Sequence, residues 1–200
     1  MSRVLVTNHL TLDGVMQAPG RADEDRRGGF EHGGWAQARN DEVMGRYMGE
    51  RMAAGGGGGA LLLGRRTYED FASFWPHQSP DNPFTTVINN MPKLVASRTL
   101  TAPLEWNNST LLEGDVAEAV AKLKAKPGKD MVVLGSGDLI QTLMKHDLVD
   151  EFLLLVHPLV LGSGRHLFVD GTPETSLRLV DSTITTTGVV IATYVPSGSA

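Results

Sequence analysis

The sequence predicts an α/β protein whose sheet is mixed but mostly parallel. Short apolar segments typical of buried strands alternate with amphipathic helical segments, a pattern that indicates parallel strands joined by helical crossovers. Near the C-terminus, segments 176–186 and 189–194 flank Thr187-Gly188, as expected for an antiparallel hairpin. The 200 residues show no internal linker or repeat, so we expect a single domain over 1–196 and a frayed tail at 197–200.

Hydrophobic periodicity and turn residues set the expected elements in order. We expect strands at 3–7, 61–63, 84–89, 93–96, 131–134 and 151–156, and helices at 41–54, 67–74, 115–126 and 139–146. The polar, glycine-rich segment 17–34 is predicted to be a long loop, a kind of segment that is usually functional or disordered. The five glycines at 55–59 are expected to end one helix and lead flexibly into the next strand.

Composition excludes several classes of protein. The net charge of −5 and the lack of a basic run argue against a nucleic-acid partner. No apolar run is long enough to cross a bilayer, and the apolar N-terminal stretch is too short for a signal peptide. Without cysteines there are no disulfides, thiolate zinc sites or cysteine nucleophiles, which suits a cytoplasmic protein. The six histidines lack metal-ligand spacing, so we predict no metal site.

The segment 64–67 (Gly-Arg-Arg-Thr) is the first candidate for ligand binding. It follows an apolar strand, and Thr67 is expected to cap the next helix, with Asp70 in a capping-box position. Two cations at the positive end of a helix are unfavourable unless an anion neutralises them. A bound phosphate would do so. Alternatively, both arginines extend into solvent or pair with Glu69 and Asp70.

Two further strand ends carry groups that suit anions. Ser97-Arg98-Thr99 follows one predicted strand, and Gly135-Ser136-Gly137 follows another. Ligands bind near the carboxyl ends of strands in open α/β sheets, and hydroxyl, arginine and glycine N–H groups all contact phosphates. Three such loops fit a diphosphate with one further phosphate, the layout of NADPH. The alternatives are a polar strand end and an ordinary helix start capped by Ser136; Ile140 stands where the dinucleotide fingerprint requires a third glycine.

Acidic and aromatic residues near the N-terminus are candidates for the reacting end of the site. Asp13 in the first turn and Glu31 in the long loop are candidate proton donors, although they would also suit a turn and a solvated loop. Phe30, Trp35 and Trp75 are candidates for a flat heterocycle pocket, with core packing as the alternative. We expect His157 to be a packed side chain, and Asp41 to begin or cap a helix.

Five segments in order resemble the dihydrofolate reductase-like superfamily. These are Leu12-Asp13-Gly14, Gly29–Trp35, Gly64–Glu69, Val133–Gly137 and Leu161–Gly164. They are most similar to the stand-alone branch related to the C-terminal reductase domain of the riboflavin-pathway protein RibD. The resemblance covers nearly the whole chain and implies a three-layer α/β/α fold, NADPH as cofactor and, in many members, a homodimer.

The resemblance also implies roles for residues of this sequence. It places Gly64, Arg65, Arg66 and Thr67 at the cofactor phosphates, and Ser97 and Arg98 at the adenosine 2′-phosphate. The diphosphate and nicotinamide ribose would lie along Gly135, Ser136, Gly137, Asp138, Leu139 and Ile140, and the nicotinamide near the turn from Thr11 to Val15. Dihydrofolate reductases carry a carboxylate early on their first helix, where this chain has the glycine-rich loop. Glu31 is the nearest candidate for that role, and Asp13 belongs to the motif of the branch.

These observations predict an NADPH-dependent reductase of a small heterocyclic (pterin- or pyrimidine-like) or carbonyl substrate. One alternative is the riboflavin-pathway reduction of 5-amino-6-(5-phosphoribosylamino)uracil, whose own phosphate would meet only Arg165 and His166 as a further basic cluster. Another is a nucleotide-binding module or sensor without turnover.

Overall fold

A single sheet of eight strands organises the computed structural model, which describes residues 1–54 and 59–198. The strands are β1 (Val4–Thr11), β2 (Ala60–Gly64), β3 (Lys93–Ala96), β4 (Ser109–Leu111), β5 (Met131–Leu134), β6 (Glu151–His157), β7 (Leu177–Ile184) and β8 (Val190–Pro196). Their order is β4-β3-β2-β5-β1-β6-β8-β7. The first six strands of this order run parallel, and β8 is antiparallel to both β6 and β7. The predicted mixed, mostly parallel sheet with a C-terminal hairpin is confirmed.

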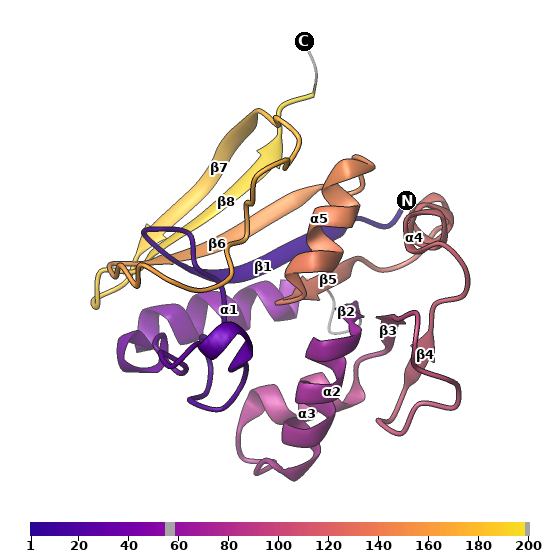
Figure 1. Cartoon of the computed structure of the whole chain (residues 1–200), viewed down its shortest axis with the longest axis horizontal. Helices are drawn as coiled ribbons and strands as arrows, with labels where there is room; N and C mark the ends of the chain where they lie inside the picture. The colour runs from indigo at the N-terminus through magenta and orange to yellow at the C-terminus, as the bar shows by residue number, and fades with distance from the viewer. Residues whose placement is uncertain (55–58, 199–200) are drawn as a thin grey trace.

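Helices cover both faces of the sheet, which gives the expected three layers (Figure 1). They are α1 (Glu42–Ala54), α2 (Arg65–Phe74), α3 (Pro83–Asn90), α4 (Val116–Ala125) and α5 (Gly137–Lys145), with short 3-10 turns at Arg27–Gly29, Gln37–Arg39 and Trp75–His77. On one face, α4 and α5 pack against Val4, Val6 and Val133, which are fully buried. This face holds the largest apolar core.

The other face is covered unevenly. There α1 packs on β6 and β8, whereas α2 and α3 pack on β2 and β3. The strands between them, β1 and β5, keep half-buried side chains on this face: Leu5, Thr7, His9, Val132 and Leu134. Because the helices leave these two strands uncovered, the middle of the sheet is open to a ligand.

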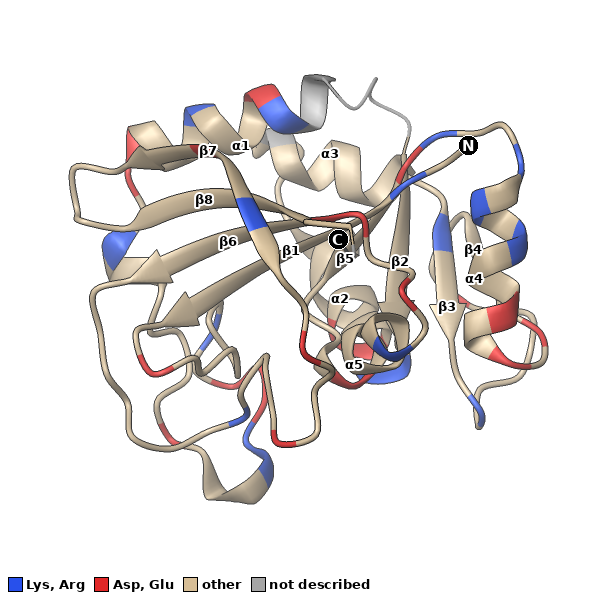
Figure 2. Ribbon diagram, turned by 90° about the horizontal axis from the view of Figure 1, so that it is seen from above, with Lys and Arg blue, Asp and Glu red and all other residues tan. Residues whose placement is uncertain are grey.

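Charged residues lie mainly on helices and loops (Figure 2). The central strands β1 and β5 contain no Asp, Glu, Lys or Arg. Glu151, the first residue of β6, is buried and pairs with Arg3 and Arg51. The middle of the open face is therefore apolar or neutral.

The segment 84–89 was predicted to be a strand, and this prediction is wrong because it forms α3. Asn82 caps this helix by accepting a hydrogen bond from Phe84 N–H at 3.0 Å. Pro83 occupies the first helical turn. These two start signals outweigh the β-branched residues that suggested a strand. The short edge strand β4 was missed, since three residues show too little alternation.

Thr67 does not cap α2, contrary to the sequence prediction. The helix begins two residues earlier, with Gly64 at the N-cap and no side-chain capping bond. Thr67 instead lies in the first turn, where its hydroxyl contacts Ser136. Helix α5 likewise begins at Gly137, two residues before the predicted start. Of the glycine run and the C-terminal tail, residues 55–58 and 199–200 lie outside the described residues.

Two kinds of feature, a membrane-spanning helix and a metal-binding group, are absent from the described ranges 1–54 and 59–198. No helix there is long and apolar enough to cross a membrane. In the same ranges, no group of His, Asp or Glu side chains is arranged to hold a metal ion.

Candidate functional site

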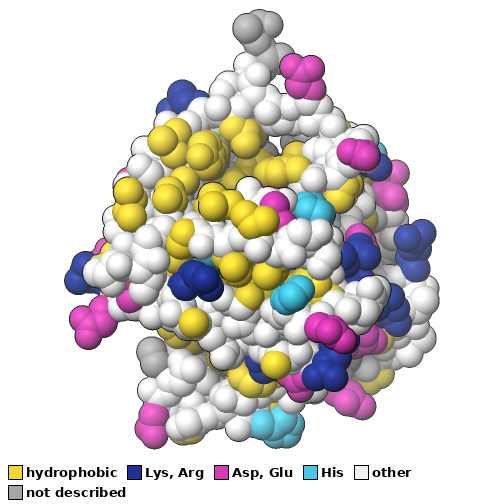
Figure 3. All heavy atoms as spheres, turned by 60° about the vertical axis from the view of Figure 1, so that its left-hand side comes forward, with side chains coloured by type: hydrophobic (Ala, Val, Ile, Leu, Met, Phe, Trp, Pro, Cys, Tyr) yellow, Lys and Arg dark blue, Asp and Glu magenta, His cyan; other side chains and the backbone are white. Residues whose placement is uncertain are grey.

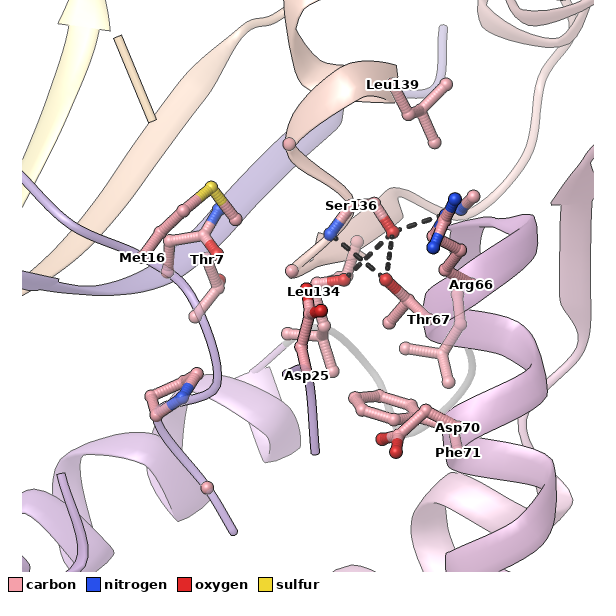
Figure 4. A pocket seen from close by; sticks show the side chains of 18 of the residues that line it. Thr7, Met16, Asp25, Arg66, Thr67, Asp70, Phe71, Leu134, Ser136 and Leu139 are labelled. Carbon is pink, nitrogen blue, oxygen red and sulfur yellow. Dashed lines mark hydrogen bonds between the residues drawn. The ribbon is translucent and has the colours of Figure 1, made fainter. Parts of the chain in front are cut away.

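A large cleft opens on the uncovered sheet face and extends past the C-terminal ends of β2, β3 and β5. Figure 4 shows Thr7 of β1, Leu134 of β5 and Asp70 of α2 around this space. Its volume is about 1810 Å³. A site for one drug-sized ligand has roughly 300–1,000 Å³, so the cleft is large enough for a dinucleotide beside a second small molecule.

The three predicted strand-end loops meet in this cleft. Since β2 lies between β3 and β5, their carboxyl ends share one edge of the sheet. The residues from these loops that line the cleft are Gly64, Arg65, Arg66, Thr67, Ser97, Arg98, Gly135, Ser136, Gly137, Asp138 and Leu139. Ile140 does not line it, because this side chain is fully buried against the α4–α5 core. Thr11 and Val15 are buried as well, while Met16 and Gln17, which follow them, line the cleft.

Ser136 joins the beginnings of α2 and α5. Its Oγ lies 3.0 Å from Thr67 Oγ1 and accepts a hydrogen bond from Gly64 N–H at 3.0 Å. Ser136 N–H donates to Thr67 Oγ1 at 3.2 Å (Figure 4). Ser136 has φ +59°, a left-handed conformation that is costly for a residue with a side chain. These hydrogen bonds hold the strained turn in place and set the spacing of the two helix ends.

The helix ends at this edge differ from the others in their capping. Side-chain oxygens of Asp41, Asn82 and Asp115 accept hydrogen bonds from the first N–H groups of α1, α3 and α4. Helices α2 and α5 have no side-chain cap, because Gly64 lacks one and the Ser136 hydroxyl is engaged elsewhere. Their first N–H groups are thus available to a bound anion.

The two arginines of α2 are weakly engaged within the protein. Arg65 lies 3.8 Å from Glu69, and both side chains are more than one third exposed. Such pairs contribute little to stability. Arg66, labelled in Figure 4, is the second residue of α2 and is exposed. Asp70, which the sequence offered as another partner for these arginines, pairs with Arg21 instead.

Neither predicted proton donor is brought to the cleft. Asp13 accepts hydrogen bonds from Thr11 Oγ1 at 2.5 Å and Gly162 N–H at 2.7 Å. These bonds, the one from Thr11 above all, lower the pKa of Asp13 to about 2. The carboxylate therefore stays ionised and fixes the turn, which was the alternative role. Glu31 is exposed and lies outside the cleft lining.

Other carboxyl groups, which sequence reasoning missed, do line the cleft. Burial raises the pKa of Asp70, despite the opposing charge of Arg21. Burial also raises the pKa of Glu24, whose Oε2 accepts hydrogen bonds from Gly20 N–H at 2.7 Å and Arg21 N–H at 3.0 Å. The Arg21 guanidinium lies 4.3 Å from the centre of the Phe74 ring. No local sequence signal distinguishes these acids from surface residues, because they meet only in the folded chain.

The aromatic candidates divide into two groups. Phe30 and Trp35 are buried in an apolar cluster with Val15, and neither lines the cleft. Trp35 Nε1 donates a hydrogen bond to Gln17 O at 2.7 Å, which fixes the long loop. The structure thus places both rings in a core, the alternative weighed above. Trp75 does line the cleft.

The fold and the cleft define an α/β protein with a dinucleotide-sized site at the carboxyl ends of its parallel strands. Residues 2–191 match the RibD C-terminal domain, and the chain belongs to this family. Family membership indicates a reductase-type oxidoreductase.

The chain is similar to two proteins of Bacillus subtilis (strain 168). It is 35% identical to YyaP over 138 residues, which is 67% of this chain and 72% of YyaP. It is 31% identical to YwjB over 119 residues, which is 60% of this chain and 63% of YwjB.

Three solved structures share the fold. A protein from Shewanella sp. PV-4, provisionally named a riboflavin biosynthesis protein, has a TM-score of 0.67 at 23% identity, covering 98% of this chain and 99% of that one. A pyrimidine reductase-like protein from Corynebacterium diphtheriae has a TM-score of 0.61 at 13% identity, covering 99% of this chain and 93% of that one. Dihydrofolate reductase from Enterococcus faecalis, complexed with NADP(H) and RAB-propyl, has a TM-score of 0.58 at 14% identity, covering 98% and 96%.

Proposed function

We propose that this protein is an NADPH-dependent reductase of a small heterocyclic or carbonyl substrate. The observation that carries the proposal is the pair of uncapped helix ends, at α2 and α5, on one edge of the cleft. Helix N-termini bind phosphate through free N–H groups and the helix dipole. Two such ends beside Arg65 and Arg66 suit a diphosphate. Membership of a reductase family and the NADP(H)-bound structural neighbour support the same cofactor.

The third strand end suits the extra phosphate of NADPH. Ser97 and Arg98 follow β3, which lies beside β2 on the side away from β5. An arginine can bind a phosphate with two parallel hydrogen bonds. We therefore assign Arg98 to the 2′-phosphate, and we place the nicotinamide toward β1 and the segment at Met16 and Gln17.

The bound nicotinamide would supply the hydride. The protein would supply the apolar floor from Leu5 and Val132, with an acid for the proton. Because Asp13 stays ionised and Glu31 lies outside the cleft, we propose Asp70 for the proton: burial raises its pKa, and the residue lines the cleft.

Titration with NADPH and with NADH tests the cofactor. NADPH should quench the fluorescence of a tryptophan in or near the cleft, such as Trp75, and should bind more tightly than NADH. Preference for NADH, or no binding of either cofactor, would contradict the proposal. Binding without oxidation of NADPH by any carbonyl or heterocyclic compound would instead favour the nucleotide-binding module.

The riboflavin-pathway reduction remains a second candidate, and Arg165 and His166 favour it because both line the cleft. Arg165 pairs with Asp138, so a substrate phosphate would have to compete with this carboxylate. Reduction of 5-amino-6-(5-phosphoribosylamino)uracil, lost in Arg165→Glu but retained in Asp138→Asn, would establish this substrate.

We also propose a homodimer through the β7 edge of the sheet. Leu179, Val180 and Ile184 on β7 are 43–69% exposed. β7 is the last strand in the sheet order, so one side of it has no strand partner among the described residues. Figure 3 shows hydrophobic side chains gathered on this side of the molecule. Sedimentation equilibrium should give a dimer, and Val180→Lys should give a monomer; a monomeric wild type would refute this proposal.

A further inference from the structure

His9 and His157 form a hydrogen-bonded pair beneath the cleft. His9 Nδ1 lies 2.8 Å from His157 Nε2, so one of these nitrogens carries the shared proton. His157, on β6, is fully buried and packs edge-to-face with Trp35, with ring centroids 5.2 Å apart. His9, on β1, lines the cleft. The pair thus links the cleft surface to the protein interior.

Both rings are neutral at neutral pH. Burial lowers the pKa of His9 to about 4. Burial lowers the pKa of His157 to about 3, and repulsion of a protonated His157 by Arg39 and by a protonated His9 acts in the same direction. Each neutral imidazole has one N–H donor and one acceptor nitrogen. Only two arrangements are consistent with the short contact: both rings protonated at Nε2, or both protonated at Nδ1.

The environment of His157 Nδ1 decides between them. This atom is buried and has no hydrogen-bond partner in residues 1–54 and 59–198. A buried N–H without an acceptor is rare, and the positive charge of Arg39 acts on the same ring. Both facts favour a lone pair at Nδ1. His157 then donates from Nε2 to His9 Nδ1, and His9 carries its own proton on Nε2.

His9 Nε2 takes no part in the hydrogen bond between the two histidines. It has no hydrogen-bond partner within the described chain, while its residue faces the cleft. β1 is separated from β2 and β3 by β5. His9 is therefore remote from the strand ends that carry Arg65, Arg66 and Arg98, and it stands where the substrate end of the cleft would be.

We propose that His9 Nε2–H donates a hydrogen bond to the carbonyl oxygen of the substrate, and that His157 is the positioning residue that keeps His9 in this donor form. The inference rests on the proposed reductase function and narrows its substrate class to aldehydes and ketones. A donor aimed at that oxygen stabilises the negative charge that develops there during reduction.

The step balances with NADPH as the reductant. A hydride adds to the carbonyl carbon with its electron pair, and the C=O π pair moves to the oxygen that His9 contacts. A proton from Asp70 or solvent then completes the alcohol, so that R₂C=O, NADPH and H⁺ give R₂CH–OH and NADP⁺. His9 donates a hydrogen bond throughout and keeps its proton.

Long-range ¹H–¹⁵N NMR of the ligand-free protein tests the donor form directly. We expect both His9 and His157 to show the Nε2–H tautomer, assigned by the loss of each signal in His9→Gln and His157→Gln. The Nδ1–H tautomer in both rings would overturn the proposal, because His9 would then present a lone pair to the cleft.

Kinetics with matched variants test the role. NADPH oxidation is followed with a panel of aldehydes and diketones. His9→Phe should lower kcat by about 100-fold, as for loss of an oxyanion-hole donor, without changing the Kd for NADPH. His9→Gln, whose amide N–H replaces Nε2–H, should recover most of this loss. His157→Leu should lower kcat by about tenfold, the size of one hydrogen bond, and His157→Gln should restore it.

The results of these experiments distinguish the proposed role of His9 from the reductase function on which it rests. Failure of the wild type to bind NADPH would refute the reductase proposal itself. If NADPH binds but only heterocycles without a carbonyl are reduced, or if nothing is reduced, the role of His9 is refuted. A kcat unchanged in His9→Phe, or a loss confined to NADPH affinity, refutes it equally.

Discussion

The hydroxyl groups of Thr67 and Ser136 lie 3.0 Å apart and join the N-terminal ends of α2 and α5. These residues are 69 positions apart in the chain. The contact sets the spacing between two groups of free N–H donors, which the diphosphate of the proposed cofactor would span.

Removing the Thr67 hydroxyl should therefore weaken cofactor binding. Thr67→Val keeps the shape of the side chain but takes away the acceptor for Ser136 N–H and Oγ. Each lost hydrogen bond of this kind costs about 0.5–1.5 kcal/mol and two are lost, so we expect the Kd for NADPH to rise by at least about fivefold. Fluorescence titration measures the change, and Thr67→Ser is the matched control that should bind normally. Equal affinity in the valine and serine variants would contradict this role.

Charge reversal should distinguish the arginines of the cleft. Arg65→Glu and Arg98→Glu should both weaken NADPH, because both side chains line the cleft at strand ends. Only Arg98→Glu should narrow the difference between NADPH and NADH, since only the 2′-phosphate differs between them. Lys122→Glu, an exposed charge change on α4 outside the cleft lining, is the control. An equal loss for both cofactors in Arg98→Glu would refute its assignment to the 2′-phosphate.

Titration of Asp70 should determine how kcat falls on the basic side of its pH profile, the basic limb. Burial raises its pKa above the ordinary value. A proton donor must be protonated to act, so wild-type kcat should fall as the pH rises through this raised pKa. Asp70→Asn should lower kcat and abolish that limb. Glu31→Gln, which removes an exposed carboxylate outside the cleft lining, should leave the profile unchanged. A basic limb that survives in Asp70→Asn would show that another group supplies the proton.

The meeting of the three strand-end loops at one edge of the cleft could be predicted from the sequence, whereas the residues that line the rest of the cleft could not. The strand ends at Gly64, Ser97 and Gly135 are local features, and parallel strands bring their carboxyl ends to one edge. His9 follows Asn8 and precedes Leu10 on β1, and it is open to the cleft only because α1 and α2 are set apart. That separation is a property of tertiary packing and leaves no local pattern.

The acids show the same limit on prediction from sequence. Asp70 meets Arg21 across 49 residues, and Asp13 meets Gly162 across 149 residues. Without those distant partners, Asp13 in a turn looks as available as any other carboxylate. The role of Asp13 in a turn could be predicted from the sequence, but which acid lines the cleft could not.

Asp13 should contribute to stability rather than to proton transfer. Its folded-state pKa of about 2 lies below its ordinary value. A carboxylate with a depressed pKa stabilises the fold above its unfolded pKa, and this contribution disappears as the pH falls through the folded value. The stability of the wild type should therefore decline between about pH 4 and pH 2, and Asp13→Asn should lose part of this decline.

Thermal unfolding at several pH values measures this effect. At pH 7, Asp13→Asn should lower the Tm, because an amide accepts the N–H groups of Leu161 and Gly162 less strongly than a carboxylate does. The Kd for NADPH and the pH dependence of kcat should stay as in the wild type. Glu31→Gln, which changes an exposed acid outside the cleft, should leave the Tm, the Kd for NADPH and the pH dependence of kcat as in the wild type. If Asp13→Asn instead keeps the wild-type Tm and loses turnover, Asp13 acts in the reaction and the turn is held by other contacts.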